Sequence, residues 1–409
     1  MPHVSFRPSP DVAAVLNNLL DQYERRHDPH ARAIRCDLEA LALPGYASHL
    51  DPEPRQVAND QFCRLEQAGL VALTWLPGEA NHLLAAVTLN PDRAGDLFAL
   101  LGRCPLAARR DRLRTLLLAD RFRLEGWRLR TVEHSLAQLR AGLSPSPFLL
   151  AADDHNRDLL AALVALGDVT EETPIRVFSV RVYNDSKRFE AVQRAVVHLA
   201  RRHHAEWREL TPDEVLREMG LVANPDHLYL FGSWRLVDGQ GVCFSLADFE
   251  PSVGLPARLV AGVRQVTVDA KRVVCVENMT SFYELVRRRP AGLAALYLGG
   301  NPSPACRHLL HCLSRTLPEP VPLLVWADLD YGGLNILAQL RRLVHPRFMP
   351  YLMDEDTLDA HVAWAKPLTP GDERALARLA RHPHLVDARP LIQHMLARGF
   401  KLEQEAISP

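Results

Sequence analysis

The sequence predicts an α/β protein of several domains (α+β as a whole), in which winged-helix-like units precede a C-terminal domain with a parallel sheet. Two observations predict this class. From residue 265 onward, apolar β-rich runs alternate with helical stretches, the pattern of a parallel sheet covered by helices. Before that point, helical stretches are followed by pairs of β-rich runs, the outline of a winged helix. The expected domains are 1–145, 146–262 and 263–409.

The N-terminal domain is expected to contain helices and one winged-helix-like unit, with a role in binding DNA or partner proteins. Residues 11–43 have apolar side chains at helical spacing. An amphipathic stretch at 57–70 precedes β-rich runs at 71–76 and 82–89, with a Pro-Gly-Glu turn between them.

Arginines are concentrated in the helical stretch that follows, at 105–140. They would either contact DNA phosphates or form a solvated helix face with the interleaved acidic residues. A Pro/Ser stretch at 143–147 marks the expected domain joint.

The middle domain is also predicted to be winged-helix-like. Residues 176–182 are β-rich, and Tyr183 is expected to lie in that strand. The next helix is expected to begin at Lys187. Two further runs, 228–236 and 241–246, predict a hairpin around Asp238-Gly239.

The C-terminal domain shows the most regular alternation. Four strands are expected, separated by three helices, and their bounds follow the periodicity of the apolar residues. The strands are 273–276, 293–298, 323–327 and 348–352, and the helices are 281–288, 304–317 and 334–343.

Acidic side chains follow two of these strands. Glu277 comes after the first strand, and Asp328 and Asp330 follow the third. Ligands bind outside the carboxyl ends of parallel strands, and an extended Asp-x-Asp points both carboxylates the same way. The three carboxylates are therefore predicted to hold one or two Mg²⁺ ions (or Mn²⁺) and to be catalytic in phosphodiester chemistry. The alternative is that each aspartate only caps the next helix.

Glycines accompany the acidic residues. Gly300 follows the second strand, and Gly332 and Gly333 follow the Asp-x-Asp segment. A residue without a Cβ lets the backbone approach a ligand closely, so these positions are predicted to approach a phosphate.

These motifs resemble a known family. Glu277 followed by Asp328-Leu329-Asp330 and Gly333 resembles the metal motif of the Toprim fold, as found in the topoisomerase VI A subunit. The resemblance to the JetD family of Wadjet anti-plasmid systems goes further and spans most of the chain. It rests on Val276-Glu277-Asn278 with Phe282, Gly299-Gly300, DLDYGG at 328–333, Met353-Asp354, Leu402-Glu403-Gln404-Glu405, and the segment 185–188.

The resemblance implies the nuclease subunit of an SMC-type complex that cuts closed circular double-stranded DNA. Its partners would be an SMC ATPase, a kleisin and a small kleisin-binding winged-helix protein, and the chain would form a homodimer. The resemblance also implies that cleavage would be hydrolytic, because this family lacks the strand-attacking tyrosine of the topoisomerase. A non-catalytic DNA-binding module and a topoisomerase VI A-like strand-cleaving subunit are the alternatives.

Five further positions are weaker candidates. Glu405, ahead of Glu403, would add a carboxylate to the metal site if the C-terminal segment folds back, and otherwise would lie on a solvated helix end. Asp354 is a possible metal ligand. Lys187 and Arg188 would contact DNA phosphates, or lie free in water at the start of a helix.

Composition limits the remaining choices. The 409 residues have a formal net charge of −1, so DNA binding must depend on local patches. Of the 48 lysines and arginines, only four are lysines. The seven cysteines form no CxxC pair, which is typical of reduced thiols in the cytoplasm. No signal peptide is evident, and no apolar run approaches the ~20 residues of a membrane span.

Overall fold

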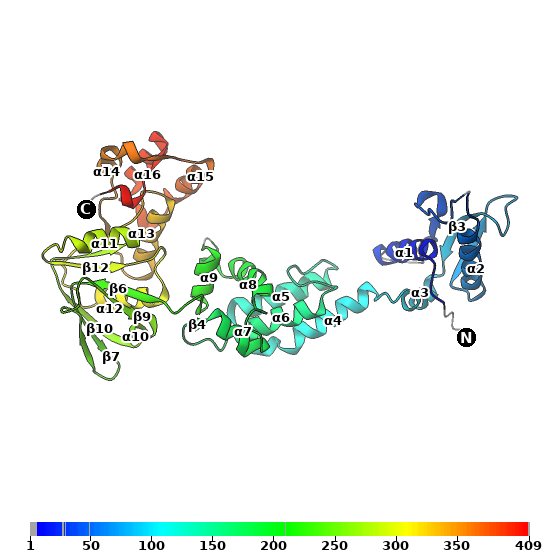
Figure 1. The fold of residues 1–409 in the computed structure, drawn as a ribbon, viewed down its shortest axis with the longest axis horizontal. Coiled ribbons are helices and arrows are strands. Elements are labelled where there is room, and N and C mark those ends of the chain that lie inside the picture. The colour runs from blue at the N-terminus through cyan, green and yellow to red at the C-terminus, as the bar shows by residue number, and fades with distance from the viewer. Residues whose placement is uncertain (1–5, 27, 29, 49, 209, 408–409) are drawn as a thin grey trace. The chain divides into compact units, whose positions relative to one another are not determined.

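The computed structural model describes residues 6–407 except residues 27, 29, 49 and 209. Contacts within the chain group it into two compact units, which are described separately (Figure 1). Unit 1 comprises Met1–Phe122 and Val132–Arg157, and unit 2 comprises Arg123–Thr131 and Asp158–Pro409. The three-domain division remains a prediction. No helix in the described ranges is both long and apolar enough to cross a bilayer.

Unit 1 contains the predicted helix followed by a hairpin. Helix α2 (Glu53–Gln67) precedes the antiparallel strands β2 (Val71–Trp75) and β3 (Leu84–Leu89). The expected helix at 11–43 is only partly correct. Helix α1 (Pro10–Arg25) is followed by strand β1 (Ile34–Asp37), which pairs with β3 and places Ile34 and Cys36 in the core. Burial alternates along β1, so every second side chain faces the core, which is the period of a strand and not that of a helix.

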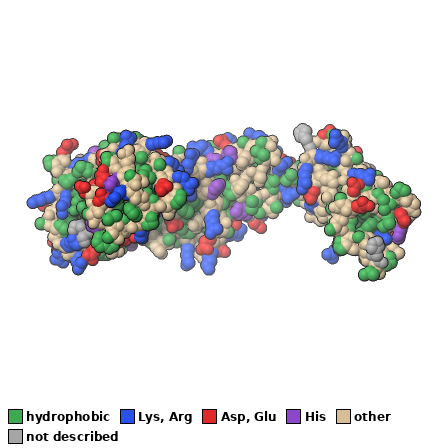
Figure 2. Space-filling view, turned by 90° about the horizontal axis from the view of Figure 1, so that it is seen from above, with side chains coloured by type: hydrophobic (Ala, Val, Ile, Leu, Met, Phe, Trp, Pro, Cys, Tyr) green, Lys and Arg blue, Asp and Glu red, His purple; other side chains and the backbone are tan. Residues whose placement is uncertain are grey.

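The arginine-rich stretch is helical, as predicted. The stretch contains α4 (Leu106–Ala119) and α5 (Gly126–Arg140). Helix α3 (Ala94–Leu100) precedes the stretch and α6 (Asp153–Ala165) follows it. Several of its arginines form ion pairs with acidic residues, including Arg121 with Glu133 and Arg112 with Asp153. Figure 2 shows basic and acidic side chains interspersed over the face in view, which fits the near-zero net charge.

The strand predicted at 176–182 is wrong, because the segment forms helix α7 (Ile175–Tyr183). Tyr183 is its last residue, and Asn184 ends the helix in a left-handed conformation at φ 56°. Phe178 is buried edge-on against Phe189, with ring centroids 5.1 Å apart. This packing overrides the β propensity of the valines in the segment. The next helix, α8 (Glu190–His203), begins three residues later than expected.

Unit 2 is built on a mixed six-stranded sheet in the order β14-β13-β11-β12-β6-β9. Its four parallel strands confirm the prediction, and all of them except the edge strand are almost wholly buried, so both faces of the inner parallel strands are covered. They are β11 (Arg272–Val276), β12 (Leu293–Tyr297), β13 (Leu323–Trp326) and β14 (Phe348–Pro350). The intervening helices are α11 (Met279–Arg287), α12 (Pro304–Ser314) and α13 (Tyr331–Leu343).

The run predicted as one strand at 228–236 forms two strands that enter different sheets. Strand β6 (His227–Phe231) joins the six-stranded sheet antiparallel to β12, whereas β7 (Ser233–Asp238) pairs with β8 (Cys243–Ser245) in the expected hairpin. Gly232 separates them at φ +104°, where an added Cβ would lie 2.7 Å from the Leu293 carbonyl oxygen. The middle segment therefore contributes strands to the C-terminal sheet instead of forming a sheet apart from it.

The remaining elements of unit 2 complete its core and carry the C-terminal segment. They are β4 (Thr173–Pro174), α9 (Pro212–Glu218), β5 (Leu221–Val222), β9 (Val253–Pro256), α10 (Ala257–Ala261), β10 (Val263–Asp269), α14 (Glu355–Ala360), β15 (Lys366–Pro367), α15 (Pro370–Leu379), α16 (Arg389–Arg398) and β16 (Phe400–Lys401). Beyond β16, Leu402 forms an antiparallel bridge with Leu329, which returns the chain to the end of β13.

Candidate functional site

The ends of β11 and β13 bring Glu277 and Asp328 together. These parallel strands are neighbours, with Val276 opposite Trp326. The Glu277 N–H donates to the Trp326 carbonyl oxygen at 3.0 Å, and Glu277 Oε2 accepts the Asp328 N–H at 3.0 Å. The two acidic residues therefore share one edge of the sheet, as their positions after successive strands predicted.

Asp330 lies at the start of α13, and its Oδ1 accepts the Gly333 N–H at 2.9 Å. A Cβ on Gly333 would lie 2.1 Å from the Asp328 carbonyl oxygen. Gly333 is therefore required for the close packing of α13 against the Asp-x-Asp segment. Gly300, at φ +88°, has no atom within 4 Å of the position a Cβ would take, so its backbone is open to approach.

The C-terminal segment folds onto this edge and supplies Gln404 and Glu405. The Gln404 N–H donates to Asp328 Oδ1 at 2.7 Å. Its fully buried side chain donates to the Trp326 carbonyl oxygen at 2.8 Å and accepts the Asn278 N–H at 2.9 Å. Glu405 Oε1 accepts a hydrogen bond from Asn278 Nδ2 at 2.6 Å. One glutamine thus connects the loops after β11 and β13.

Sequence reasoning missed Gln404 and Asn278 as functional residues. Both are neutral amides beside acidic residues, so neither stands out in a search for catalytic carboxylates. The signal that could have found Asn278 is its place directly after Glu277. For Gln404, only the long-range contact with residues 126 and 78 positions away reveals its role.

The carboxylates at this edge repel one another. Burial raises the pKa of Glu277 to about 7, with further contributions from Asp328, Asp330 and Glu405, while the Asp328 N–H opposes the rise. Burial, followed by Asp330, Glu405 and Glu403, raises the pKa of Asp328 to about 6, against the hydrogen bond from the Gln404 N–H. Grouped carboxylates without a nearby cation favour binding of a positive charge.

The donor set fits a hydrated Mg²⁺ or Mn²⁺ ion. Among the described residues, no three His, Cys, Asp or Glu side chains are arranged to enclose a metal directly. Mg²⁺ keeps several waters and is held through one or two carboxylates, so a closed cage is not required. Glu277, Asp328 and Asp330 each have one oxygen held by a backbone N–H, which leaves the other oxygen of each carboxylate for a cation.

The weaker candidates lie elsewhere or have other contacts. Asp354 caps α14, where it accepts the Thr357 N–H at 2.8 Å. The Glu403 carboxylate pairs with Lys366. Lys187 is exposed, whereas Arg188 Nε donates to Asp158 Oδ2 at 2.8 Å and its guanidinium lies 5.8 Å from the centre of the Tyr183 ring.

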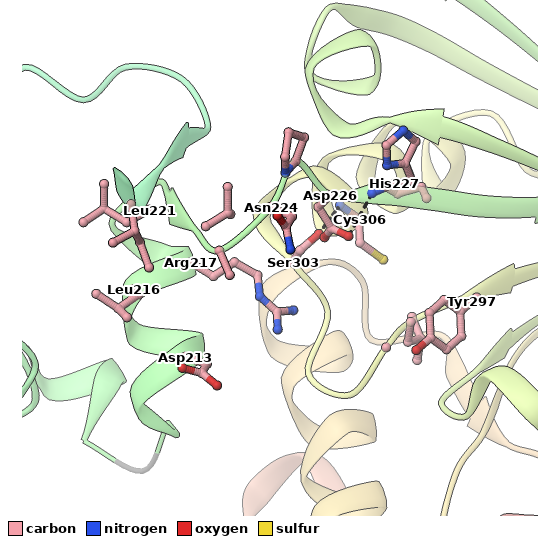
Figure 3. A pocket seen from close by; sticks show the side chains of 17 residues that line it. Asp213, Leu216, Arg217, Leu221, Asn224, Asp226, His227, Tyr297, Ser303 and Cys306 are labelled. Atoms are coloured by element: carbon pink, nitrogen blue, oxygen red, sulfur yellow. Dashed lines mark hydrogen bonds between the residues drawn. The ribbon is translucent and has the colours of Figure 1, made fainter. Parts of the chain in front are cut away.

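A pocket of about 410 Å³ borders the site at the end of β12. Its walls include α9, the loop 223–226 and the start of α12, and Figure 3 shows the Arg217 guanidinium extending into it. Gly299 forms part of the lining, and its N–H donates to the Glu277 carbonyl oxygen at 3.2 Å. The pocket therefore shares a loop with the carboxylate edge.

Comparison with known proteins agrees with the motifs. Residues 247–409, which contain all four carboxylates, match the family model described as Wadjet protein JetD, C-terminal. The chain is also 23% identical over 403 residues to the Wadjet protein JetD of Bacillus cereus (strain Q1), a match that covers 96% of this chain and 97% of that protein. The chain is a relative of JetD. The resemblance predicted from the sequence is thereby confirmed, and it extends over unit 1 as well as unit 2.

Proposed function

We propose that this chain acts in Wadjet anti-plasmid defence as a divalent-metal-dependent endonuclease that hydrolyses closed circular DNA. The relation to JetD supports the defence role. The observation that carries the chemistry is the gathering of Glu277, Asp328, Asp330 and Glu405 at one edge of the sheet, with two pKa values raised by burial and by one another.

In this proposal Glu277, Asp328 and Asp330 hold Mg²⁺ or Mn²⁺. A bound divalent ion would stabilise the leaving oxygen and make water a better nucleophile. The chain's own task is orientation. Backbone N–H groups of Asp328, Gln404 and Gly333 each fix one carboxylate oxygen, so the acidic side chains are positioned before DNA arrives.

Hydrolysis is favoured over attack by a tyrosine of the middle segment. The Tyr183 hydroxyl donates to the Asp158 carbonyl oxygen at 2.7 Å, and burial raises its pKa above the usual value for tyrosine. A tyrosine that attacks phosphorus must lose its proton and be free to move. Tyr183 meets neither requirement.

The partners are part of the proposal. We infer an SMC ATPase, a kleisin and a kleisin-binding winged-helix protein, together with double-stranded circular DNA and a cytoplasmic location. A homodimer would bring two sites to one duplex, so that both strands are cut in one event. Each follows from the relation to JetD and from the metal chemistry above.

The test uses supercoiled plasmid, Mg²⁺ or Mn²⁺, and the full chain with and without its SMC partners. Asp328→Asn removes a proposed ligand, and Asp356→Asn on the exposed surface of α14 is the matched control. We expect linear product that requires metal, persists in the control and disappears in Asp328→Asn. Intact plasmid in the presence of an active partner ATPase would overturn the nuclease and leave a DNA-binding assembly module.

A further inference from the structure

Helix α8 and the segment after it form a groove of about 580 Å³, here called the basic groove. Every charged side chain that lines it in the described part of the chain is basic. These side chains are Arg194, Arg201, Arg202 and Arg208, and His198 lines the groove beside them. In a chain of net charge −1, such a concentration of one sign is a local electrostatic feature that a polyanion would recognise.

Two arginines of the groove, Arg194 and Arg208, are available to a ligand, and the helix that carries the groove is held in place by its packing. The apolar face of α8 buries Val192, Val196 and Leu199, which directs the opposite face outward. Arg201 Nε and Nη2 donate to the Arg208 carbonyl oxygen at 3.1 and 3.0 Å, which fixes the following segment against the helix. Arg194 and Arg208 are exposed, and their guanidinium groups form no hydrogen bond or ion pair with other described residues.

The segment that follows α8 connects the basic groove to the carboxylate edge. Arg208 lines the groove, whereas Glu206 and Leu210 line a second pocket together with Tyr331. Tyr331 directly follows Asp330 in the chain. Glu206 also pairs with Arg342 of α13 at 3.2 Å. Glu206 and Leu210, two positions before and two positions after Arg208, therefore face the helix that begins at the Asp-x-Asp segment. The groove and the carboxylates belong to one compact unit.

We propose that the basic groove binds the phosphate backbone of duplex DNA beyond the point of cutting; this rests on the proposed nuclease function. Arginine donates to phosphate in a planar fork, and it is the basic residue of this groove. Arg194 and Arg201 are two helical turns apart, roughly 10 Å along the axis, which spans about three base-pair steps. The groove is a better phosphate site than Arg188, whose guanidinium already contacts Asp158 and Tyr183.

The experiment measures the affinity of the full chain for a labelled 30-base-pair duplex in EDTA, by fluorescence anisotropy over a range of NaCl concentrations. The test variant is Arg194→Gln with Arg208→Gln, because neither side chain has a hydrogen-bond or ion-pair partner among the residues that the structure describes. The control is Arg258→Gln with Arg287→Gln, which removes the same charge from exposed sites elsewhere in unit 2. Each phosphate contact contributes about 0.9 to the slope of log affinity against log salt.

We expect the slope to fall by about 1.8 in the test variant and to stay unchanged in the control. A slope that is the same in both variants would overturn the groove as a DNA site. The groove proposal would also be overturned if the groove bound RNA or an acidic protein preferentially and did not bind duplex DNA. Plasmid cutting by the wild-type chain, measured in parallel, separates the two proposals. If cutting persists while the slope does not change, only the groove is wrong.

Discussion

Replacing Glu277 by Gln should stabilise the metal-free protein at alkaline pH. The side chain keeps its shape, and its amide oxygen can still accept the Asp328 N–H. What changes is the charge. Because the folded-state pKa of Glu277 is raised from 4.5 to about 7, the native chain binds an extra proton between these values. Its stability therefore falls as pH rises through this window, and the full penalty applies above pH 7.

The size of this penalty follows from the shift. A rise from 4.5 to about 7 corresponds to at most about 3 kcal/mol at pH 8 and to less than about 1 kcal/mol at pH 5. The chain has two compact units, so a single unfolding free energy does not describe it. Hydrogen exchange of the β13 amides, followed by mass spectrometry, reports the local free energy of opening.

In EDTA at pH 8 we expect these amides to be protected up to about a hundredfold better in Glu277→Gln than in the wild type, with a much smaller difference at pH 5. The exposed substitution Asp356→Asn should change neither. Saturating Mg²⁺ should reverse the order, because the ion stabilises only a chain that holds it. Equal protection at pH 8, or a gap that does not shrink at pH 5, would refute the electrostatic argument.

Three other substitutions test the geometry. Gln404→Ala leaves the Trp326 carbonyl oxygen and the Asn278 N–H without the buried Gln404 side chain as a partner. We therefore expect hydrogen exchange to show a loss of about 1–3 kcal/mol in local stability and the plasmid assay to show reduced cutting. Unchanged cutting would exclude a positioning role for Gln404. Gly333→Ala places a Cβ 2.1 Å from the Asp328 carbonyl oxygen, so thermal unfolding of unit 2 should shift downward and cutting should fall. Tyr183→Phe removes one hydrogen bond, about 1 kcal/mol, and should leave cutting intact, with no protein–DNA adduct on a denaturing gel.

The sequence predicted the parallel strands of unit 2 well, because continuous apolar runs bounded by polar loops have few alternative structures. Predictions failed where local pattern and tertiary packing disagree. The valines of α7 suit a strand, yet the Phe178–Phe189 contact and the end at Asn184 make the segment helical. The split at Gly232 depends on how closely the backbone approaches Leu293, which no local window of sequence contains.

For the candidate site, the sequence was sufficient for residues next to strands and insufficient for those that arrive from far away. Glu277, Asp328 and Asp330 were predicted together because adjacent parallel strands end at one edge. Glu405 was only a weaker candidate, since nothing local says where a C-terminal segment packs. Its contact with Asn278 joins residues 127 positions apart.

That distance has a consequence for biosynthesis. Asp328 emerges from the ribosome before the Gln404 N–H that holds it, with 76 positions between them. At roughly 5–20 residues per second, this interval lasts about 4–15 seconds. During this interval the growing polypeptide contains Glu277 and Asp328 but not the Gln404 N–H that orients Asp328. A polypeptide released before residue 404 would never form this hydrogen bond, so translation to this point is itself a condition for an assembled site.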